Sequence, residues 1–148
     1  MRKIQLASAA IVLFLVFYAC KKSVNPTSNA RTVQNLSGSY NLTALKGSIL
    51  GISINLYDSL PPCERDNVIQ LNADLTAQFI DSGTVSAIRC VPPSDSTGTW
   101  SLSQNTDTLY IAGSANFITS WNGTTLVLTG DQSVSGYTAT VTTTLVKK

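Results

Sequence analysis

The chain has 148 residues, with ten basic and eight acidic side chains, a net charge of +2 and no histidine. Without histidine, the chain lacks the usual general base of enzymes and the commonest protein ligand of metals. A net charge this close to zero gives no electrostatic reason to expect a nucleic-acid partner. From composition we therefore expect no cofactor, no bound metal and no nucleic-acid partner.

The chain opens with Met-Arg-Lys, and an uncharged apolar run follows over residues 4–19. This order is typical of a secretory signal peptide, and the run is shorter than the roughly 20 residues of a spanning helix. The small Ala19 precedes Cys20, and the segment resembles a bacterial lipoprotein signal. The resemblance implies removal of residues 1–19 and a membrane anchor of acyl chains on Cys20. A plain signal peptide cut elsewhere, or an uncleaved anchor, are the alternatives.

Residues 20–35 are polar, contain a proline and have no sustained apolar period. We predict a flexible tether here, which over about 15 residues would span on the order of 20 Å. Signals that send some lipoproteins to the cell exterior resemble acidic runs after the cysteine, and this chain has none. The resemblance therefore implies an exported outer-membrane lipoprotein on the periplasmic side rather than on the cell surface.

The remaining residues, 36–148, are enough for one domain and too few for two. Apolar residues recur at every second position, as in Leu50, Ile52 and Ile54, which predicts strands with one buried face and one solvated face. Turn residues separate the runs, with turns predicted over 46–48 and 130–136 among others. The predicted strands cover residues 38–45, 49–57, 67–72, 75–81, 98–103, 108–112, 117–121 with 124–129, and 137–146. An antiparallel barrel or sandwich is the physical expectation.

A family resemblance is carried by PPCERDNVIQLNADLT, by Cys90 with the PPSDSTGTWSLS that follows it, and by TLYI, TTLVLTG and YTATVTTTL. The chain resembles the lipocalin-like domain of small bacterial lipoproteins over residues 36–148. The resemblance implies an all-β, up-and-down antiparallel barrel of about eight strands. One departure is Leu75, where the family's turn usually has glycine, and this counts against a tight two-residue turn at Asp74.

Cys63 and Cys90 are the two cysteines that remain after Cys20 is assigned to the signal. We predict a disulfide between them, because an exported chain meets an oxidising compartment. Such a loop closure would stabilise the fold by roughly 3–4 kcal/mol. Metal-binding or catalytic thiolates are the alternative, but the pair lacks CxxC spacing and the chain lacks histidine.

We predict no catalysis, because the many serines and threonines have no histidine to activate them. A glycosidase needs two facing carboxylates, and the candidates fall almost entirely in predicted turns. They are Asp58, Glu64, Asp66, Asp74, Asp81, Asp95, Asp107 and Asp131. The cluster of Asp58, Glu64 and Asp66 could hold a hard cation, or could be an exposed loop whose charge Arg65 offsets.

Aromatic residues remain as candidates for ligand contact, since a barrel interior or mouth lined by them would hold an apolar molecule. The four candidates are Tyr40, Phe79, Trp100 and Trp121. Each could instead fill the core, and Trp100 shares a predicted face with Leu102. Two functions follow: a lipid-anchored module that binds a small apolar ligand or lipid, or an interaction module with a filled barrel that docks on an envelope protein.

Overall fold

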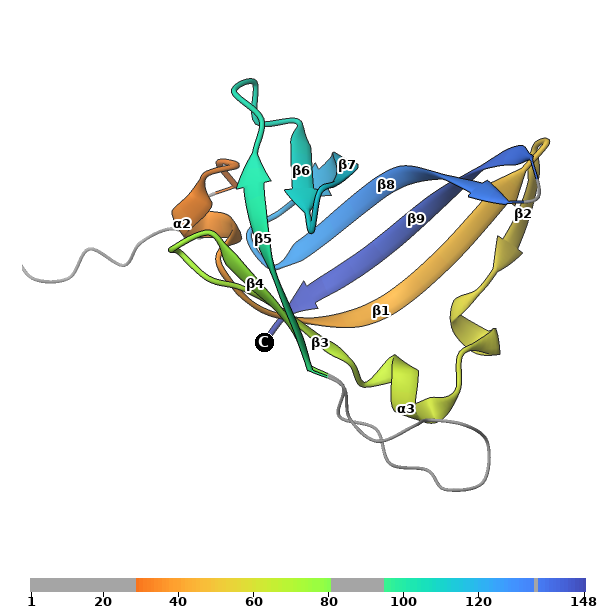
Figure 1. Cartoon of the computed structure of the whole chain (residues 1–148), viewed down its shortest axis with the longest axis horizontal. Helices are drawn as coiled ribbons and strands as arrows, with labels where there is room; N and C mark the ends of the chain where they lie inside the picture. The colour runs from red at the N-terminus through yellow and green to blue at the C-terminus, as the bar shows by residue number, and fades with distance from the viewer. Residues whose placement is uncertain (1–28, 81–94, 135) are drawn as a thin grey trace, which may run out of the picture.

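The computed structural model of the protein describes residues 29–80, 95–134 and 136–148 (Figure 1). The strands in these ranges are β1 (Gly38–Ile49), β2 (Ile52–Asn55), β3 (Val68–Leu71), β4 (Thr76–Ile80), β5 (Ser96–Leu102), β6 (Thr108–Ile111), β7 (Ser114–Trp121), β8 (Thr125–Val134) and β9 (Tyr137–Lys147). Three short helical turns accompany them, α2 (Val33–Leu36), η1 (Tyr57–Ser59) and α3 (Pro62–Arg65).

The strands form one antiparallel sheet that closes on itself. Along the sheet the order is β2, β1 and then β3 to β9 in sequence, and β9 pairs again with β1. β1 and β3 to β9 therefore make a closed barrel of eight strands, with β2 as an extra strand beside the carboxyl-terminal half of β1. The prediction of an all-β, up-and-down antiparallel barrel is confirmed. Closure leaves no free edge within the ring.

The core fills one end of the barrel, which we call the closed end. Its largest fully buried side chains are Trp100, Tyr40, Leu36, Leu71, Leu109, Leu126 and Leu145. α2 lies at this end, where Val33 and Leu36 pack against the same cluster (Figure 1). The Thr32 hydroxyl starts α2 by accepting a 3.2 Å hydrogen bond from the backbone N–H of Asn35, as is typical of a helix N-cap. The Tyr40 hydroxyl donates a 2.7 Å bond to the Leu36 carbonyl oxygen and so joins α2 to β1.

A bulge in β1 changes which of its residues point inward. The pairing of β1 with β9 shifts between Leu42 and Ala44, so Thr43 is one residue too many for the ladder. Its hydroxyl donates a 3.2 Å hydrogen bond to the Thr144 carbonyl oxygen of the neighbouring strand. A bulge adds one residue to a period of two, so inward positions are even-numbered before Thr43 and odd-numbered after it.

The turn predicted over residues 46–48 is wrong, because β1 continues through it, and β8 likewise extends into the turn predicted over 130–136. The chain reverses instead at Leu50, which has a left-handed backbone with φ of 51°. Gly47 is not a turn residue but a point of close approach inside a strand. A Cβ at this position would lie 3.0 Å from Leu56 Cδ1, so the glycine leaves room for that leucine.

Some predictions fall outside the described residues, namely the signal peptide over 1–19, the lipidated Cys20 and the second cysteine, Cys90. Cys63 is buried in α3, and its pairing with Cys90 stays a prediction. Residues 33–35 were placed in the tether by sequence, but they belong to α2. Within the part of the chain that the structure describes, no helix is long and apolar enough to cross a membrane.

Candidate functional site

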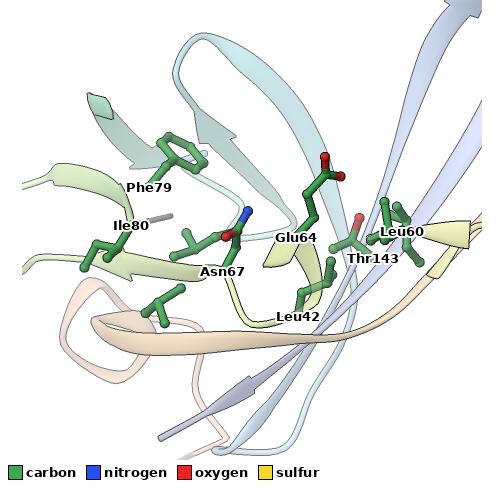
Figure 2. Close-up of a pocket in the computed structure, with 10 residues that line it drawn as sticks. Leu42, Leu60, Glu64, Asn67, Phe79, Ile80 and Thr143 are labelled. Atoms are coloured by element: carbon green, nitrogen blue, oxygen red, sulfur yellow. The ribbon is translucent and has the colours of Figure 1, made fainter. Parts of the chain in front are cut away.

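A cavity of about 390 Å³ lies at the end of the barrel away from α2, which we call the open end. It lies between β1 and β9 on one side, β3 and β4 on the other, and the segment from η1 to α3 (Figure 2). Its lining residues are Leu42, Leu45, Leu60, Glu64, Asn67, Val68, Ile69, Phe79, Ile80 and Thr143. A mainly apolar lining and a volume within roughly 300–1,000 Å³ are typical of small-molecule sites.

Four strands supply the inner wall of the cavity. Tyr40 of the buried core pairs with Ile69 of β3, and Ile69 pairs with Phe79 of β4, so these side chains share the inner face. Leu45 of β1 pairs with Thr143 of β9. Because the bulge in β1 has reversed the phase by this point, Leu45 also faces inward. The wall therefore depends on the bulge as much as on the alternation of apolar residues.

The rim of the cavity is the segment from η1 to α3, and Arg65 holds it together. Its Nε donates a 2.9 Å bond to the Leu60 carbonyl oxygen, and its Nη2 donates a 2.6 Å bond to the Asp58 carbonyl oxygen. The guanidinium also lies 5.6 Å from the centroid of the Tyr57 ring, a cation–π contact of about 0.5–1 kcal/mol. These contacts position Leu60 and Glu64 beside the cavity (Figure 2).

The polar groups of the cavity are few. Among the described lining residues Glu64 alone carries a charge, and its side chain is exposed at the rim. Asn67 and Thr143 add an amide and a hydroxyl group. Glu64 has no second carboxylate opposite it within this lining, so the described residues do not form the acid–base pair of a glycosidase here. The site offers apolar contact inside and polar contact at its edge.

A second hollow, of about 750 Å³, lies on the outer face of β1 and β3. Asn41 and Gln70 contribute to it from strand positions that alternate with the inward Tyr40 and Ile69. Its other lining residues include the charged Arg65, Asp66 and Lys148. Because this hollow carries three charged side chains and lies outside the barrel, the cavity at the open end is the candidate site.

The family model of the lipocalin-like domain matches residues 36–128, more than half of the chain. The chain belongs to the lipocalin-like domain family. No curated protein matches it at a significant level.

Solved structures of bovine odorant-binding protein are similar to this lipocalin-like domain. A deswapped triple mutant has 16% identity and a TM-score of 0.47, over 77% of this chain and 74% of that one. A complex with undecanal has 14% identity and a TM-score of 0.48, over 79% and 74%. A complex with a selenium-containing odorant has 15% identity and a TM-score of 0.47, over 79% and 73%.

Of the four aromatic residues predicted to contact a ligand, three lie in the core of the lipocalin-like domain and one lines the cavity. The indole Nε1 of the buried Trp100 donates a 2.8 Å bond to the Asn72 carbonyl oxygen. Tyr40 and Trp121 lie together at the closed end, with ring centroids 6.5 Å apart. Trp121 Nε1 is buried and has no acceptor within the described part of the chain. Phe79 is the one placed on the cavity, and ligand contact stays a prediction.

Several lining residues of the cavity were not predicted from the sequence. Leu45 is out of phase with Tyr40 and Leu42, so an uninterrupted period of two would place it on the outer face. Only the cross-strand register reveals the bulge that turns it inward. Leu60 stands among turn residues just before two prolines, and an apolar residue in such a loop was the available signal for the rim.

The cation site considered from the sequence is not formed by the described residues. The Asp58 carboxylate accepts a 2.6 Å hydrogen bond from Asn55 Nδ2, whereas Glu64 lies at the cavity rim. No group of three or more acidic, cysteine or histidine side chains that could hold a metal ion occurs in residues 29–80, 95–134 and 136–148.

Two other acidic residues of the lipocalin-like domain hold turns together. Asp74 Oδ1 accepts a 2.6 Å bond from the Thr76 hydroxyl and a 3.0 Å bond from its backbone N–H. These bonds lower the pKa of Asp74, the hydroxyl first. Asp107 accepts a 2.9 Å bond from the hydroxyl of Thr108. Such local bonds are the usual reason for Asp in a turn.

Proposed function

We propose that the protein binds a small apolar molecule or lipid in the cavity at the open end of the barrel and does not change it chemically. The observation that carries this proposal is the cavity of about 390 Å³ with a mainly apolar lining. Burial of about eight methylene groups contributes roughly 6 kcal/mol. A net binding energy of that size corresponds to a Kd of tens of micromolar.

The charge at the rim favours some polar groups at the end of the ligand over others. A ligand with its apolar part in the cavity would place its polar end beside Glu64 and Asn67. A carboxylate there would meet the negative charge of Glu64, and like charges in contact disfavour binding. We therefore expect long-chain alcohols and amines to bind more tightly than fatty-acid anions of the same length.

Displacement of a fluorescent apolar probe, phenylnaphthylamine, tests the proposal on the full chain. We expect Leu45→Trp to fill the cavity and to weaken probe binding by at least about tenfold, which corresponds to about 1.4 kcal/mol. Lys46→Trp is the matched control, because the neighbouring Lys46 is exposed on the other face of β1. It should leave the Kd of the probe unchanged.

An equal effect of both substitutions would contradict binding in this cavity. Probe binding that neither substitution changes would favour the other function, an interaction module that docks on an envelope protein through its outer surface. The packed closed end of the barrel is compatible with either function, because it lies away from the cavity.

We also propose that the protein is an exported lipoprotein, held through acyl chains on Cys20 at the periplasmic side of the outer membrane. The support is the order of a basic start, an apolar run and a small residue before this cysteine. A segment of about 12 residues joins Cys20 to Val33, the first residue of α2, and by its composition this segment would act as a flexible tether.

A further inference from the structure

Four large apolar side chains are exposed at the open end of the barrel, beyond the cavity. They are Leu50 (83% exposed), Ile52 (67%), Ile54 (51%) and Tyr137 (58%), and we call them the distal tip. The turns of the β1–β2 and β8–β9 hairpins project together, because β1 pairs with β9 along most of its length (Figure 1). The two hairpins therefore present their apolar residues at one place.

Leu50 combines two unfavourable features at the end of its hairpin. Its φ of 51° is left-handed, a conformation that is unfavourable for most residues other than glycine. Its side chain is also the most exposed of the large apolar residues described. Asparagine or glycine would adopt this backbone at lower cost, would expose no large apolar side chain and is favoured in such a turn. The stability of the hairpin does not explain a leucine here, whereas contact with an apolar partner does.

The distal tip continues the apolar surface of the cavity. Leu45, which lines the cavity, accepts a 2.9 Å hydrogen bond at its carbonyl oxygen from the N–H of Leu56. Ile52 and Ile54 precede Leu56 at alternate positions and Ile54 pairs with Gly47 of β1, so they share the face of β2 that is continuous with the cavity. Tyr137 lies on the inward-facing side of β9. An apolar surface therefore leads from the cavity to the tip.

The size and chemistry of the tip favour a membrane over a protein partner. Four partly exposed side chains offer on the order of 500 Å², below the roughly 800 Å² that each partner of a standard protein interface buries. Insertion into a bilayer needs no such area, because each apolar side chain that enters contributes by itself. The tyrosine suits this location, since its ring is apolar and its hydroxyl reaches water.

We propose that the distal tip inserts into the interface of a lipid bilayer and that an apolar ligand passes between the membrane and the cavity along the inner face of β2. The passage of a ligand rests on the proposed function of the cavity, whereas the insertion of the distal tip does not. The distal tip lies at the end of the barrel opposite α2 (Figure 1).

Fluorescence quenching in the full chain tests insertion, with phosphatidylcholine vesicles whose acyl chains carry bromine. An indole is introduced by Tyr137→Trp, and Phe117→Trp is the matched control, because Phe117 is also 58% exposed but lies on β7. The unsubstituted chain gives the background from the two buried tryptophans. We expect emission from position 137 to fall by about half, as for a ring at the acyl boundary, and emission from position 117 to stay unchanged.

A second set of substitutions tests whether the tip itself causes the quenching. We expect Leu50→Asn with Ile52→Thr to reduce quenching at position 137 by at least about threefold, while both new residues keep the hairpin geometry. Leu75→Asn is the control, since Leu75 has the same left-handed backbone in the β3–β4 turn near the closed end. It should leave quenching unchanged.

Equal quenching at positions 117 and 137, no quenching at either, or quenching that survives the tip substitutions would each overturn the proposal. A dimer in sedimentation that the tip substitutions dissociate would also overturn it, because a second copy of the chain would then cover the tip. Leu45→Trp in the cavity should not affect quenching at position 137, once the emission of the Leu45→Trp chain that keeps Tyr137 is subtracted. Loss of ligand binding and loss of insertion are therefore separate results.

Discussion

The ammonium group of Lys147 donates a 2.9 Å hydrogen bond to the carbonyl oxygen of Asn35, a residue 112 positions earlier in the chain. Its Nζ also lies 5.9 Å from the ring centroids of both Tyr40 and Trp121. The end of β9 therefore joins the start of the domain at the closed end of the barrel. Burial lowers the pKa of Lys147, because the ammonium group loses hydration there.

The first prediction concerns Tyr40 and alkaline pH. Burial raises the pKa of Tyr40 well above its usual value of 10.0, so the unfolded state loses this proton first as pH rises. The free energy of unfolding should therefore fall above about pH 10. The lowered pKa of Lys147 acts in the opposite direction, since the folded state loses that proton first and stability rises between the lowered pKa and 10.5.

Tyr40→Phe should make the protein less stable at neutral pH by about 1–2 kcal/mol, because the Leu36 carbonyl oxygen loses its donor. The same substitution should reduce the decline in stability above about pH 10. Urea unfolding across pH measures both effects. Tyr110→Phe is the control, since Tyr110 is exposed. An alkaline decline that Tyr40→Phe leaves intact would exclude Tyr40 as its source.

The second prediction concerns Leu75, where the chain lacks the glycine usual in its family. Leu75 has φ of 69° and closes a turn in which its N–H donates a 3.0 Å bond to the Asn72 carbonyl oxygen. Leu75→Gly should raise the free energy of unfolding by about 0.5–1 kcal/mol, because the left-handed strain disappears. Gln78→Gly in the neighbouring extended strand should lower it by a similar amount. Thermal melting compares the two, and a loss of stability in both would contradict strain at Leu75.

The third prediction concerns the bulge at Thr43. Deletion of this residue would leave Leu42, Ala44 and Leu45 opposite Leu145, Thr144 and Thr143 in a regular ladder, so Leu45 would still face the cavity. We expect the deletion to keep phenylnaphthylamine binding. Thr43→Val keeps the extra residue and loses the bond to the Thr144 carbonyl oxygen, so it should cost about 0.5–1.5 kcal/mol of stability and keep binding. A folded deletion variant that loses probe binding would contradict this account of the phase of β1.

The fourth prediction is the disulfide between Cys63 and Cys90, of which Cys90 lies outside the described residues. Cys63 is buried in α3, next to the cavity-lining Glu64. Loss of the bond should lower stability by roughly 3–4 kcal/mol. Reduction should then lower Tm by well over about 10 °C, since about 1 kcal/mol shifts a domain of this size by roughly 4–8 °C. Free thiols at both positions in exported protein would exclude the bond, as mass measurement after alkylation would reveal.

The fifth prediction is acylation of Cys20. Cys20→Ser should leave unprocessed precursor and abolish labelling with a radioactive fatty acid. Cys63→Ser serves as the control and should remain labelled, because Cys63 lies inside the domain. Labelling that persists after Cys20→Ser would contradict the lipoprotein assignment.

The choice of a barrel over a sandwich came from the family resemblance, whereas the sequence by itself determined the all-β class and the approximate strands. These features follow from local periodicity, since a strand with one buried face must alternate apolar and polar residues. Tyr137, Ala139 and Val141 illustrate this on β9. The order of short motifs along the chain also indicated the lipocalin-like family, and the match over residues 36–128 confirms this prediction.

The tertiary structure alone decided where the cavity lies and which residues line it. Leu45 faces inward because of a bulge that only the pairing of β1 with β9 reveals. Gly47 lies inside β1, where the lack of a side chain leaves room for Leu56. Tyr40 and Trp121 pack beside Lys147 at the closed end instead of lining the cavity. Register between strands that are distant in sequence sets all of these relationships, and a local period carries no information about register.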